Sequence, residues 1–311
     1  MKIVKYIKSP SRVTIFVILF STLYLAGVAV LTNVKVEHWV IIGMYNLCYF
    51  MNPKTRKIIL AFTIFVVFAL LYDLMKLYPN YLMNHVDISS LYHFEKNIFG
   101  FSYHNQLVTP NEFFATNHNT ILDILTGLFY INWIPVPLAF ALWSYMRNKE
   151  LFLHFSLTFF LVNVIGFCIY YIHPAAPPWY VNLYGFQLHL NVPGNTAGLA
   201  RFDEFFHIPV FNSIYARNSN VFAAMPSLHC AYPVIVLFYA LKSKISWRVN
   251  GLLGVFMAGI WFSAVYSGHH YVTDVIAGIF CAGLGILLFQ KILLKIPKFQ
   301  KWISKYKLLI S

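Results

Sequence analysis

Two polar residues at the start of an apolar segment have the types and the spacing of a catalytic pair. His270 and Asp274 are four residues apart, so in a helix they lie on one face and the carboxylate can reach an imidazole nitrogen. Such a contact fixes the tautomer of the ring and stabilises its charged form, which leaves the other ring nitrogen free to attack. An Asp inside a membrane span costs about 2.5–3.5 kcal/mol on insertion scales, so it needs a partner and a role. The spacing predicts that His270 is a nucleophile and that Asp274 orients it.

A second histidine lies at the predicted start of another apolar segment, in the run Pro226-Ser227-Leu228-His229. Pro226 suits the first turn of a helix, where its missing N–H costs nothing. The free N–H groups and the positive dipole of a helix start form a cradle for phosphate, to which Ser227 can add a hydroxyl donor. His229 then serves as general acid and base, because the pKa of a free histidine side chain is about 6.5. The run predicts a phosphate site with its own proton carrier.

Two other interpretations of these residues stay open. His270 and Asp274 could form a structural pair that ties two helices together. His229, His270 and Asp274 are also acceptable zinc ligands, but no HExxH motif and no cysteine cluster accompanies them. We therefore predict no metal and no cofactor. The four cysteines lie scattered in apolar stretches and are interpreted as small core residues: Cys48, Cys168, Cys230 and Cys281.

The composition indicates which elements hold this chemistry. Of 311 residues, 59% are apolar and 11% are charged, whereas a soluble domain carries about 25% charged residues. The apolar residues form long blocks, most of them near the ~20 residues that cross ~30 Å of hydrocarbon. We predict an all-α, polytopic membrane bundle of eight spans. The spans are roughly 14–32, 34–51, 57–76, 120–146, 151–172, 226–242, 249–267 and 270–293.

The net charge of +13 reflects membrane topology rather than a nucleic-acid partner, because the basic residues sit in short clusters between the apolar blocks and no nucleic-acid-binding motif accompanies them. With eight spans, most Lys and Arg residues fall on one side, including Lys2, Lys5, Lys8, Arg12 and the tail at 294–311. The positive-inside rule then places both termini in the cytoplasm. Without the span at 34–51 this asymmetry is lost. The basic residues on the opposite side are Lys35, Lys96, Arg201 and Arg217.

Two long segments, about 77–119 and 173–225, then lie on the non-cytoplasmic face. After Asp87, the apolar residues Ile88, Leu91, Phe94 and Ile98 recur at helical spacing. Further along, Thr109-Pro110-Asn111-Glu112 has the pattern of a capping box with Pro at the first helical position. We expect two short amphipathic helices on the outer membrane surface, which either cap the bundle or contact substrate.

Together these motifs resemble a known family. Pro226-Ser227-Leu228-His229, followed by His269-His270-Tyr271 and Asp274, resembles the superfamily of type 2 phosphatidic acid phosphatases, and within it the fungal-type inositol phosphorylceramide synthases. The resemblance covers roughly residues 80–293. Further shared runs are LDIL at 122–125, PAAPPWY at 174–180, LYG at 183–185 and GLAR at 198–201.

The resemblance implies that His270 is the nucleophile, Asp274 its orienting carboxylate and His229 the acid and base. The chain departs from the phosphatases of the superfamily, because Ser263 is followed by Ala264 and no Lys-x6-Arg-Pro run exists. The usual phosphate-binding cations are therefore missing.

Arg201 is the best candidate to replace these cations, since a guanidinium can hold phosphate oxygens bidentately. A loop-ordering salt bridge from Arg201 to Asp203 or Glu204 is the alternative. The other predicted substrate or phosphate contacts are Ser227, His269, Tyr271 and Asp123.

Asp73 and Asp123 lie near the outer ends of their spans, as helix-end groups or as partners of substrate hydroxyls. The Pro-rich run at Trp179 is either a rigid lid, a lipid-entry lip or plain architecture. His118 and His173 have no assigned role.

The resulting prediction is a lipid phosphotransferase with its active site on the non-cytoplasmic face. Its donor is a phosphatidylinositol-like phospholipid and its acceptor a ceramide-like lipid alcohol. A lipid phosphatase that uses water is the alternative, and a non-catalytic lipid transporter or scramblase is the alternative from another class. We expect one membrane domain over 1–311, with N-terminal spans at 1–76, interfacial helices at 77–119, a catalytic core at 120–293 and a basic tail at 294–311.

Overall fold

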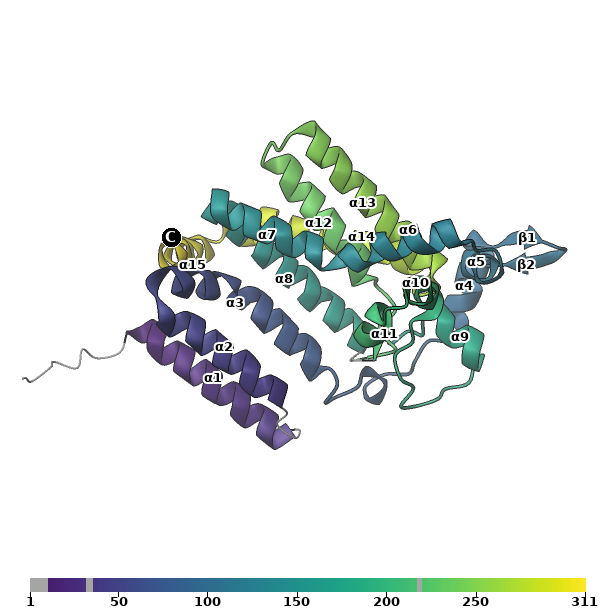
Figure 1. Ribbon diagram of the computed structural model, residues 1–311, viewed down its shortest axis with the longest axis horizontal. Helices are drawn as coiled ribbons and strands as arrows, with labels where there is room; N and C mark the ends of the chain where they lie inside the picture. Colours follow the sequence, from purple (N-terminus) through teal and green to yellow (C-terminus); the bar gives the residue numbers. More distant parts are fainter. Residues whose placement is uncertain (1–10, 32–35, 217–219) are drawn as a thin grey trace, which may run out of the picture. The chain divides into compact units, whose positions relative to one another are not determined.

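The computed structural model describes residues 11–31, 36–216 and 220–311 (Figure 1). Five basic residues that entered the topology prediction lie outside this part of the chain: Lys2, Lys5, Lys8, Lys35 and Arg217.

Every predicted span is helical in the described residues, which confirms the all-α membrane bundle. Among the described residues, five helices are long and apolar enough to cross a membrane, and a bent pair makes six, so the count of eight stays a prediction. The helices are α1 (Arg12–Leu31), α2 (Val36–Met51), α3 (Pro53–Leu74), α6 (Thr120–Tyr130) with α7 (Pro135–Arg147), α8 (Lys149–Ile172), α12 (Leu228–Lys242), α13 (Trp247–Tyr266) and α14 (Val272–Lys291).

The bent pair is the predicted span at 120–146. A short 3-10 turn, η2 (Ile131–Trp133), separates α6 from α7, and the two helices meet at 44°. Pro135 opens α7, and because it lacks an N–H it cannot continue the hydrogen-bond ladder of α6. Through η2 the bend contacts α13 and α12, and His229 lies on α12.

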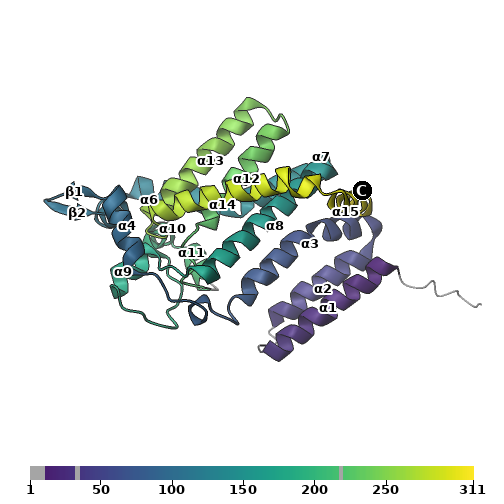
Figure 2. The ribbon, with the colours of Figure 1, turned by 180° about the vertical axis from the view of Figure 1, so that it is seen from behind.

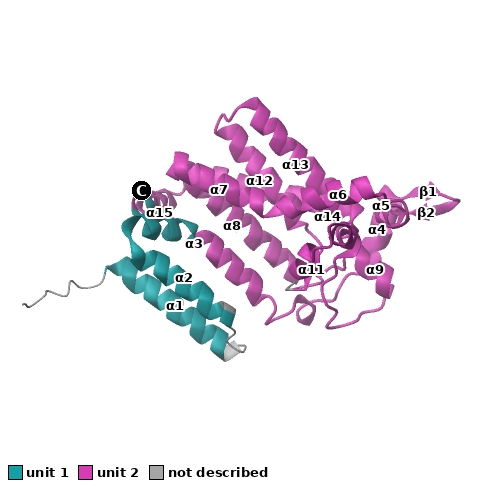
Figure 3. Ribbon diagram, viewed as in Figure 1, with its two compact units in different colours: residues 1–63, 309–311 teal, residues 64–308 magenta. Residues whose placement is uncertain are grey.

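The chain divides into two compact units, residues 1–63 with 309–311, and residues 64–308 (Figure 3). In the first unit, α1 and α2 lie side by side. Their polar contacts include Asn46 Nδ2 donating to Ser21 Oγ at 2.8 Å and the hydroxyls of Thr14 and Tyr49 at 2.9 Å. Side-chain hydrogen bonds between helices, such as these two part-buried ones, hold helices together where lipid surrounds them.

In the second unit, α12 packs against α7, α8, α13 and α14 (Figure 2). Tyr232 donates to Asn163 Oδ1 on α8 at 2.5 Å, and Trp261 on α13 donates to the carbonyl of Cys230 at 2.9 Å. Gly278 on α14 lies where a Cβ would be 2.2 Å from the carbonyl oxygen of Ser227. Small residues at such crossings let two backbones approach closely, so α14 runs directly past the start of α12.

The connecting segments of this unit gather where α13 ends and α14 begins (Figure 1). They comprise η1 (Asn80–Leu82), α4 (Ser89–Phe99), β1 (Phe101–Tyr103), β2 (Gln106–Val108), α5 (Pro110–Thr116), α9 (Pro178–Tyr184), η3 (Ala197–Leu199), α10 (Ala200–Phe206) and α11 (Val210–Tyr215). After α14 the chain continues through η4 (Leu293–Lys295) into α15 (Pro297–Ile310).

Both predicted amphipathic helices of segment 77–119 exist, as α4 and α5. The capping box is confirmed: Glu112 N donates to Thr109 Oγ1 at 3.2 Å and Thr109 N to Glu112 Oε2 at 2.7 Å. The β1–β2 hairpin between them was not predicted. Its two-residue turn uses His104 and Asn105 at positive φ, where Asn-Gly is the usual signal.

Candidate active site

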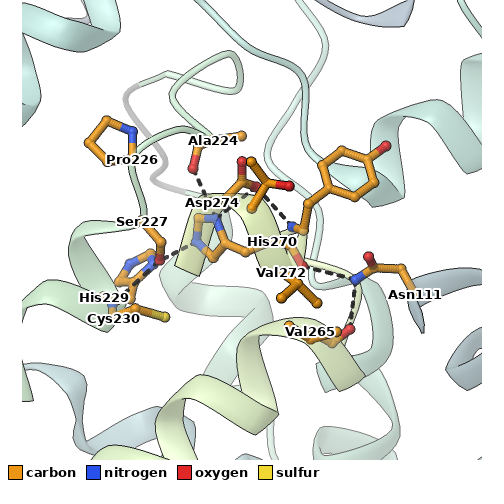
Figure 4. Close-up of polar contacts among 12 residues, drawn as sticks. Asn111, Ala224, Pro226, Ser227, His229, Cys230, Val265, His270, Val272 and Asp274 are labelled. Atoms are coloured by element: carbon orange, nitrogen blue, oxygen red, sulfur yellow. Dashed lines mark hydrogen bonds and ion pairs between the residues drawn. The ribbon is translucent and has the colours of Figure 1, made fainter. Parts of the chain in front are cut away.

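The predicted catalytic histidines lie in direct contact (Figure 4). Nδ1 of His229, in the first turn of α12, is 3.2 Å from Nε2 of His270, just before α14. The amide of Ser227 donates to the carbonyl of Asp274 at 3.0 Å, and Gly278 leaves room for the Ser227 carbonyl. The starts of α12 and α14, which are far apart in sequence, therefore bring His229 and His270 into contact.

His270 has a defined tautomer. Its Nδ1 lies 3.0 Å from the carbonyl oxygen of Ala224 and 3.6 Å from Oδ2 of Asp274. Both oxygens only accept, so Nδ1 carries the hydrogen and Nε2 carries the lone pair. The predicted Asp274 contact is present, but a backbone carbonyl that was not predicted makes the shorter one. His270 and Asp274 are both buried.

His229 is oriented by aromatic residues rather than by a carboxylate. Since Nε2 of His270 is an acceptor, the Nδ1 of His229 that faces it must carry a hydrogen. The hydroxyl of Tyr130, on α6, is 3.1 Å from the same nitrogen. The ring of Trp133 in η2 meets the His229 ring edge-on, with centroids 4.3 Å apart. The end of α6 and the turn that follows it therefore pack against His229 through Tyr130 and Trp133.

The carboxylate of Asp274 also closes the start of its own helix. Its Oδ2 accepts from Tyr271 N at 2.8 Å, whereas its buried Oδ1 has no hydrogen-bond partner among the described residues.

At α12 the helix starts later than predicted: Ser227 is the N-cap and its Oγ accepts from Cys230 N at 3.4 Å. Pro226 thus precedes the cap instead of occupying the first turn, because Ser227 is the better capping residue.

The Pro-rich segment at 174–180 fixes the surroundings of His270. Ala175 N donates to the carbonyl of Phe222 at 3.0 Å, and Ala224 N donates to the carbonyl of Ala175 at 3.3 Å. Trp179 N donates to the carbonyl of Gly268 at 3.0 Å. The segment therefore holds both the carbonyl that His270 faces and the loop that leads into His270. Its roles as a lid or as a lipid-entry lip stay predictions.

Arg201 and Asp123 form an ion pair. Nε of Arg201 is 2.6 Å from Oδ1 of Asp123, which also accepts from the hydroxyl of Tyr266 at 2.8 Å. Nδ1 of His118 lies 3.6 Å from Oδ2 of Asp123. Within the described residues, Nη2 of Arg201 is buried without a hydrogen-bond partner. The guanidinium is thus charge-balanced but retains donors for a ligand.

The alternative salt bridge considered for Arg201 has a different partner from the one expected. Arg201 pairs with Asp123, on α6. Asp203 instead accepts from the amides of Phe211 and Asn212, at 3.0 and 2.9 Å, and so caps α11. The first N–H groups of α11 have no partner within the helix. Asp203 accepts from two of them and therefore does not pair with Arg201.

His269 and Tyr271 lie in packed surroundings beside the predicted catalytic residues. The His269 ring is stacked between Tyr130 and Tyr215, with centroids 5.7 and 4.3 Å away, and its Nε2 donates to the carbonyl of Thr196 at 2.9 Å. Burial lowers the pKa of His269 to about 3, so the ring is neutral at physiological pH. Tyr271 is 1% exposed. Their roles as substrate contacts stay predictions.

Two residues that support the site were missed in the sequence. Asn111 on α5 donates from Nδ2 to the carbonyls of Val265 and His270, at 2.8 and 2.9 Å. Glu95 on α4 is fully buried and binds the start of α14. Glu95 had a recognisable signal, because it falls on the apolar stripe with Leu91 and Ile98. Asn111 had none beyond its place in the capping box.

Asp73 and His173, whose roles the sequence left open, each lie beside a side chain of opposite type. Asp73 is bound by Lys76 at 2.7 Å, and Nε2 of His173 lies 3.5 Å from Oδ2 of Asp87. In the part of the chain that the structure describes, no group of three or more His, Cys, Asp or Glu residues is arranged to hold a metal ion. Metal independence of the chemistry stays a prediction.

Comparison with known families identifies the superfamily of the chain. The family model described as PAP2 superfamily matches residues 106–288, which include His229, His270 and Asp274. The chain belongs to the PAP2 superfamily. The family resemblance seen in the motifs is therefore confirmed. Glu95 and α4 lie upstream of the matched residues.

Curated relatives narrow the membership. The chain is 47% identical over 94% of its length to the phosphoinositol dihydroceramide synthase of Bacteroides thetaiotaomicron, covering 96% of that protein. It is 28% identical to the inositol phosphorylceramide synthase of Candida albicans, over 78% of this chain and 49% of that one. It is 30% identical to the inositol phosphorylceramide synthase catalytic subunit of Saccharomyces cerevisiae, over 58% of this chain and 44% of that one. These relatives confirm the predicted class, a lipid phosphotransferase. No solved structure matches the chain.

Proposed function

We propose that this protein transfers a phosphoinositol group from a phospholipid to the primary hydroxyl of a ceramide-type lipid, with His270 as nucleophile. The observation that carries the proposal is the geometry of the two histidines: Nε2 of His270 bears a lone pair, 3.2 Å from a ring nitrogen of His229 that bears a hydrogen. The head group follows the names of the relatives, one of which is a phosphoinositol dihydroceramide synthase. That name also favours dihydroceramide as acceptor.

In the first half-reaction, Nε2 of His270 attacks the phosphorus of the donor and a P–N bond forms. The P–O bond to diacylglycerol breaks, and His229, which enters this step as the imidazolium with hydrogen on both ring nitrogens, gives one proton to the departing oxygen and is left neutral. The ring of His270 becomes positively charged as the bond forms. Asp274 at 3.6 Å and the Ala224 carbonyl at 3.0 Å stabilise that charge through Nδ1.

In the second half-reaction, the acceptor hydroxyl takes the place of diacylglycerol. His229, now a neutral imidazole, removes the hydroxyl proton and becomes the imidazolium again while the oxygen attacks the phosphorus. The P–N bond breaks, and His270 and His229 return to their starting states. Two successive displacements let two bulky lipids use one site in turn.

Arg201 is the proposed contact for the phosphate oxygens or the head group. Its Nη2 is buried and unbonded within the described residues, and Gly198 packs beside it with no side chain. Asp123 accepts from Arg201 and Tyr266, so it aims the guanidinium and can also accept from an inositol hydroxyl. Preorganised donors of this kind stabilise charge in the transition state.

The site is proposed to face the non-cytoplasmic side of the membrane. The basic cluster at 54–57 and the basic tail support cytoplasmic positions for the other ends of the spans. The elements α4, α5, α9, α10 and α11, which belong to the segments at 77–119 and 173–225, gather where α13 ends and α14 begins (Figure 1), and His270 lies between these two helices.

The test uses purified protein in detergent with phosphatidylinositol labelled in its inositol ring, with and without dihydroceramide. A labelled product that migrates as a new lipid, and that requires dihydroceramide, is the expected result. Release of water-soluble inositol phosphate at the same rate with or without dihydroceramide would instead identify a hydrolase. His270→Ala should abolish both products, whereas lipid scrambling that survives this substitution would identify a non-catalytic transporter.

A further inference from the structure

The start of α14 is closed by a carboxylate from another helix. Glu95 on α4 is 0% exposed. Its Oε1 accepts from Val272 N at 2.9 Å, and its Oε2 accepts from Thr273 N at 3.0 Å and from Thr273 Oγ1 at 2.6 Å. A fully buried carboxylate is costly unless every bond it makes is well placed. Glu95 meets that condition only because it lies at the start of this helix.

Two acidic residues thus share the free amides of one helix start. The first N–H groups of a helix have no partner within the helix and attract negative charge. Asp274 accepts from Tyr271 N through Oδ2, and Glu95 accepts from the next two amides. The same Oδ2 of Asp274 is the atom that lies 3.6 Å from Nδ1 of His270.

We propose that Glu95 is a positioning residue for the His270–Asp274 pair, a role that rests on the phosphotransfer function proposed above. By binding Val272 N, Thr273 N and the Thr273 hydroxyl, it leaves Asp274 with a single amide to accept from. Without Glu95, these buried donors draw on the carboxylate of Asp274, which is on their own first turn. Asp274 then turns away from His270, and the charge that forms on His270 loses its support.

The substitution Glu95→Gln tests this with almost no change in volume. One Gln corner is an NH₂ group, which cannot accept, so at least one of the two amides loses its bond and faces a second donor. We expect kcat to fall about 10- to 100-fold, as for a misplacement of a catalytic group by about 1 Å. The KM for the donor lipid should stay within about threefold, because Glu95 is assigned no contact with substrate.

A double-mutant cycle separates positioning from general stability. If Glu95 acts through Asp274, then Glu95→Gln should cost little in a protein that already carries Asp274→Asn, about threefold or less. Losses that multiply, with the double variant slower than Asp274→Asn by the full factor of Glu95→Gln, would overturn the proposal. Glu204→Gln is the control, because it also neutralises a carboxylate but at an exposed position on α10.

Thr273→Val provides a second variant if Glu95→Gln does not fold. It removes one of the three bonds to Glu95 and keeps the carboxylate, so kcat should fall by a few fold, again with no further loss on top of Asp274→Asn. An unchanged kcat in Glu95→Gln, or in Thr273→Val where Glu95→Gln does not fold, would refute the role of Glu95. Failure of the wild-type protein to form any phosphohistidine would instead refute the proposed function, so the two failures are distinguishable.

Discussion

Replacing Gly278 by Ala should separate the two histidines. Gly278 lies on α14 where a Cβ would be 2.2 Å from the carbonyl oxygen and 3.1 Å from the carbonyl carbon of Ser227. Both atoms are backbone, so no side chain can rotate away to make room. Ser227 is two residues before His229, and its amide is bonded to the carbonyl of Asp274. The strain therefore falls on the contact between the two helix starts.

The magnitude follows from these distances. Ordinary contact begins at 3.4 Å, so α12 and α14 must move apart by about 1 Å locally, a shift that a close-packed interior resists. The same shift takes the 3.2 Å contact between His229 Nδ1 and His270 Nε2 beyond hydrogen-bond range. We expect a loss of about 100-fold in transfer rate. The accompanying destabilisation should be about 1–3 kcal/mol, as for other overpacked sites.

Gly283→Ala is the matched control on the same helix. A Cβ at Gly283 has nothing within 4 Å, so this variant gains the helix propensity of Ala, about 1 kcal/mol, without the clash. Both variants are compared with wild type for thermal unfolding in detergent and for transfer of labelled head group to dihydroceramide. If Gly278→Ala transfers as fast as Gly283→Ala, the close approach of Ser227 does not set the histidine geometry and the reasoning is wrong.

Four further predictions follow from the site. His270→Ala should abolish an acid-labile phosphoryl adduct mapped by mass spectrometry, while His229→Ala should slow turnover yet still allow labelling by a donor with a nitrophenyl leaving group; an adduct on His229 would contradict this order of roles. Chelation by EDTA should leave turnover unchanged, and a loss that zinc or magnesium restores would indicate a metal site. Burial holds the pKa of His269 at about 3 instead of 6.5, so as pH falls the unfolded chain binds a proton at His269 before the folded protein does. The stability that the protein has above pH 6.5 should therefore decrease as pH falls toward 3. Thermal unfolding should show a smaller decrease in the His269→Gln variant. Reporter fusions within 100–115 and 185–215 should read non-cytoplasmic, and a cytoplasmic signal would reverse the topology.

The helices could be predicted because hydropathy is a property of each segment alone. Every apolar block became helical, and the capping box at Thr109 and Glu112 formed as its residue types indicate. The bend after α6 was missed, although Pro135 marks it, because a Pro inside a long apolar run is also compatible with one kinked span. The late start of α12 was missed because Pro226 and Ser227 are both good helix-start residues, and only the Ser227 side chain caps.

The candidate site was predictable to the extent that its side chains lie close in sequence. His270 and Asp274 are four residues apart at the start of α14, so their contact was expected from spacing, although His270 itself precedes the helix, which begins at Val272. Partners supplied by distant segments had no such signal. The acceptor for Nδ1 of His270 is the backbone carbonyl of Ala224, and a carbonyl looks the same at every residue. The acid that pairs with Arg201 is Asp123, 78 residues away, rather than a neighbour along the chain.

The connecting segments are therefore part of the chemistry, although they contribute few reactive groups. His270 sits on a short turn between α13 and α14 that could adopt many conformations in isolation. Separate segments bind that turn and the helix start after it: Asn111 holds the carbonyl of His270, Trp179 holds the carbonyl of Gly268, Gly198 holds the carbonyl of Ser267, and Glu95 holds the first amides of α14. Each bond is to backbone, so each fixes position without competing for the imidazole. In the proposed mechanism His270 meets two different lipids in turn, and such support would keep its geometry independent of which lipid is bound.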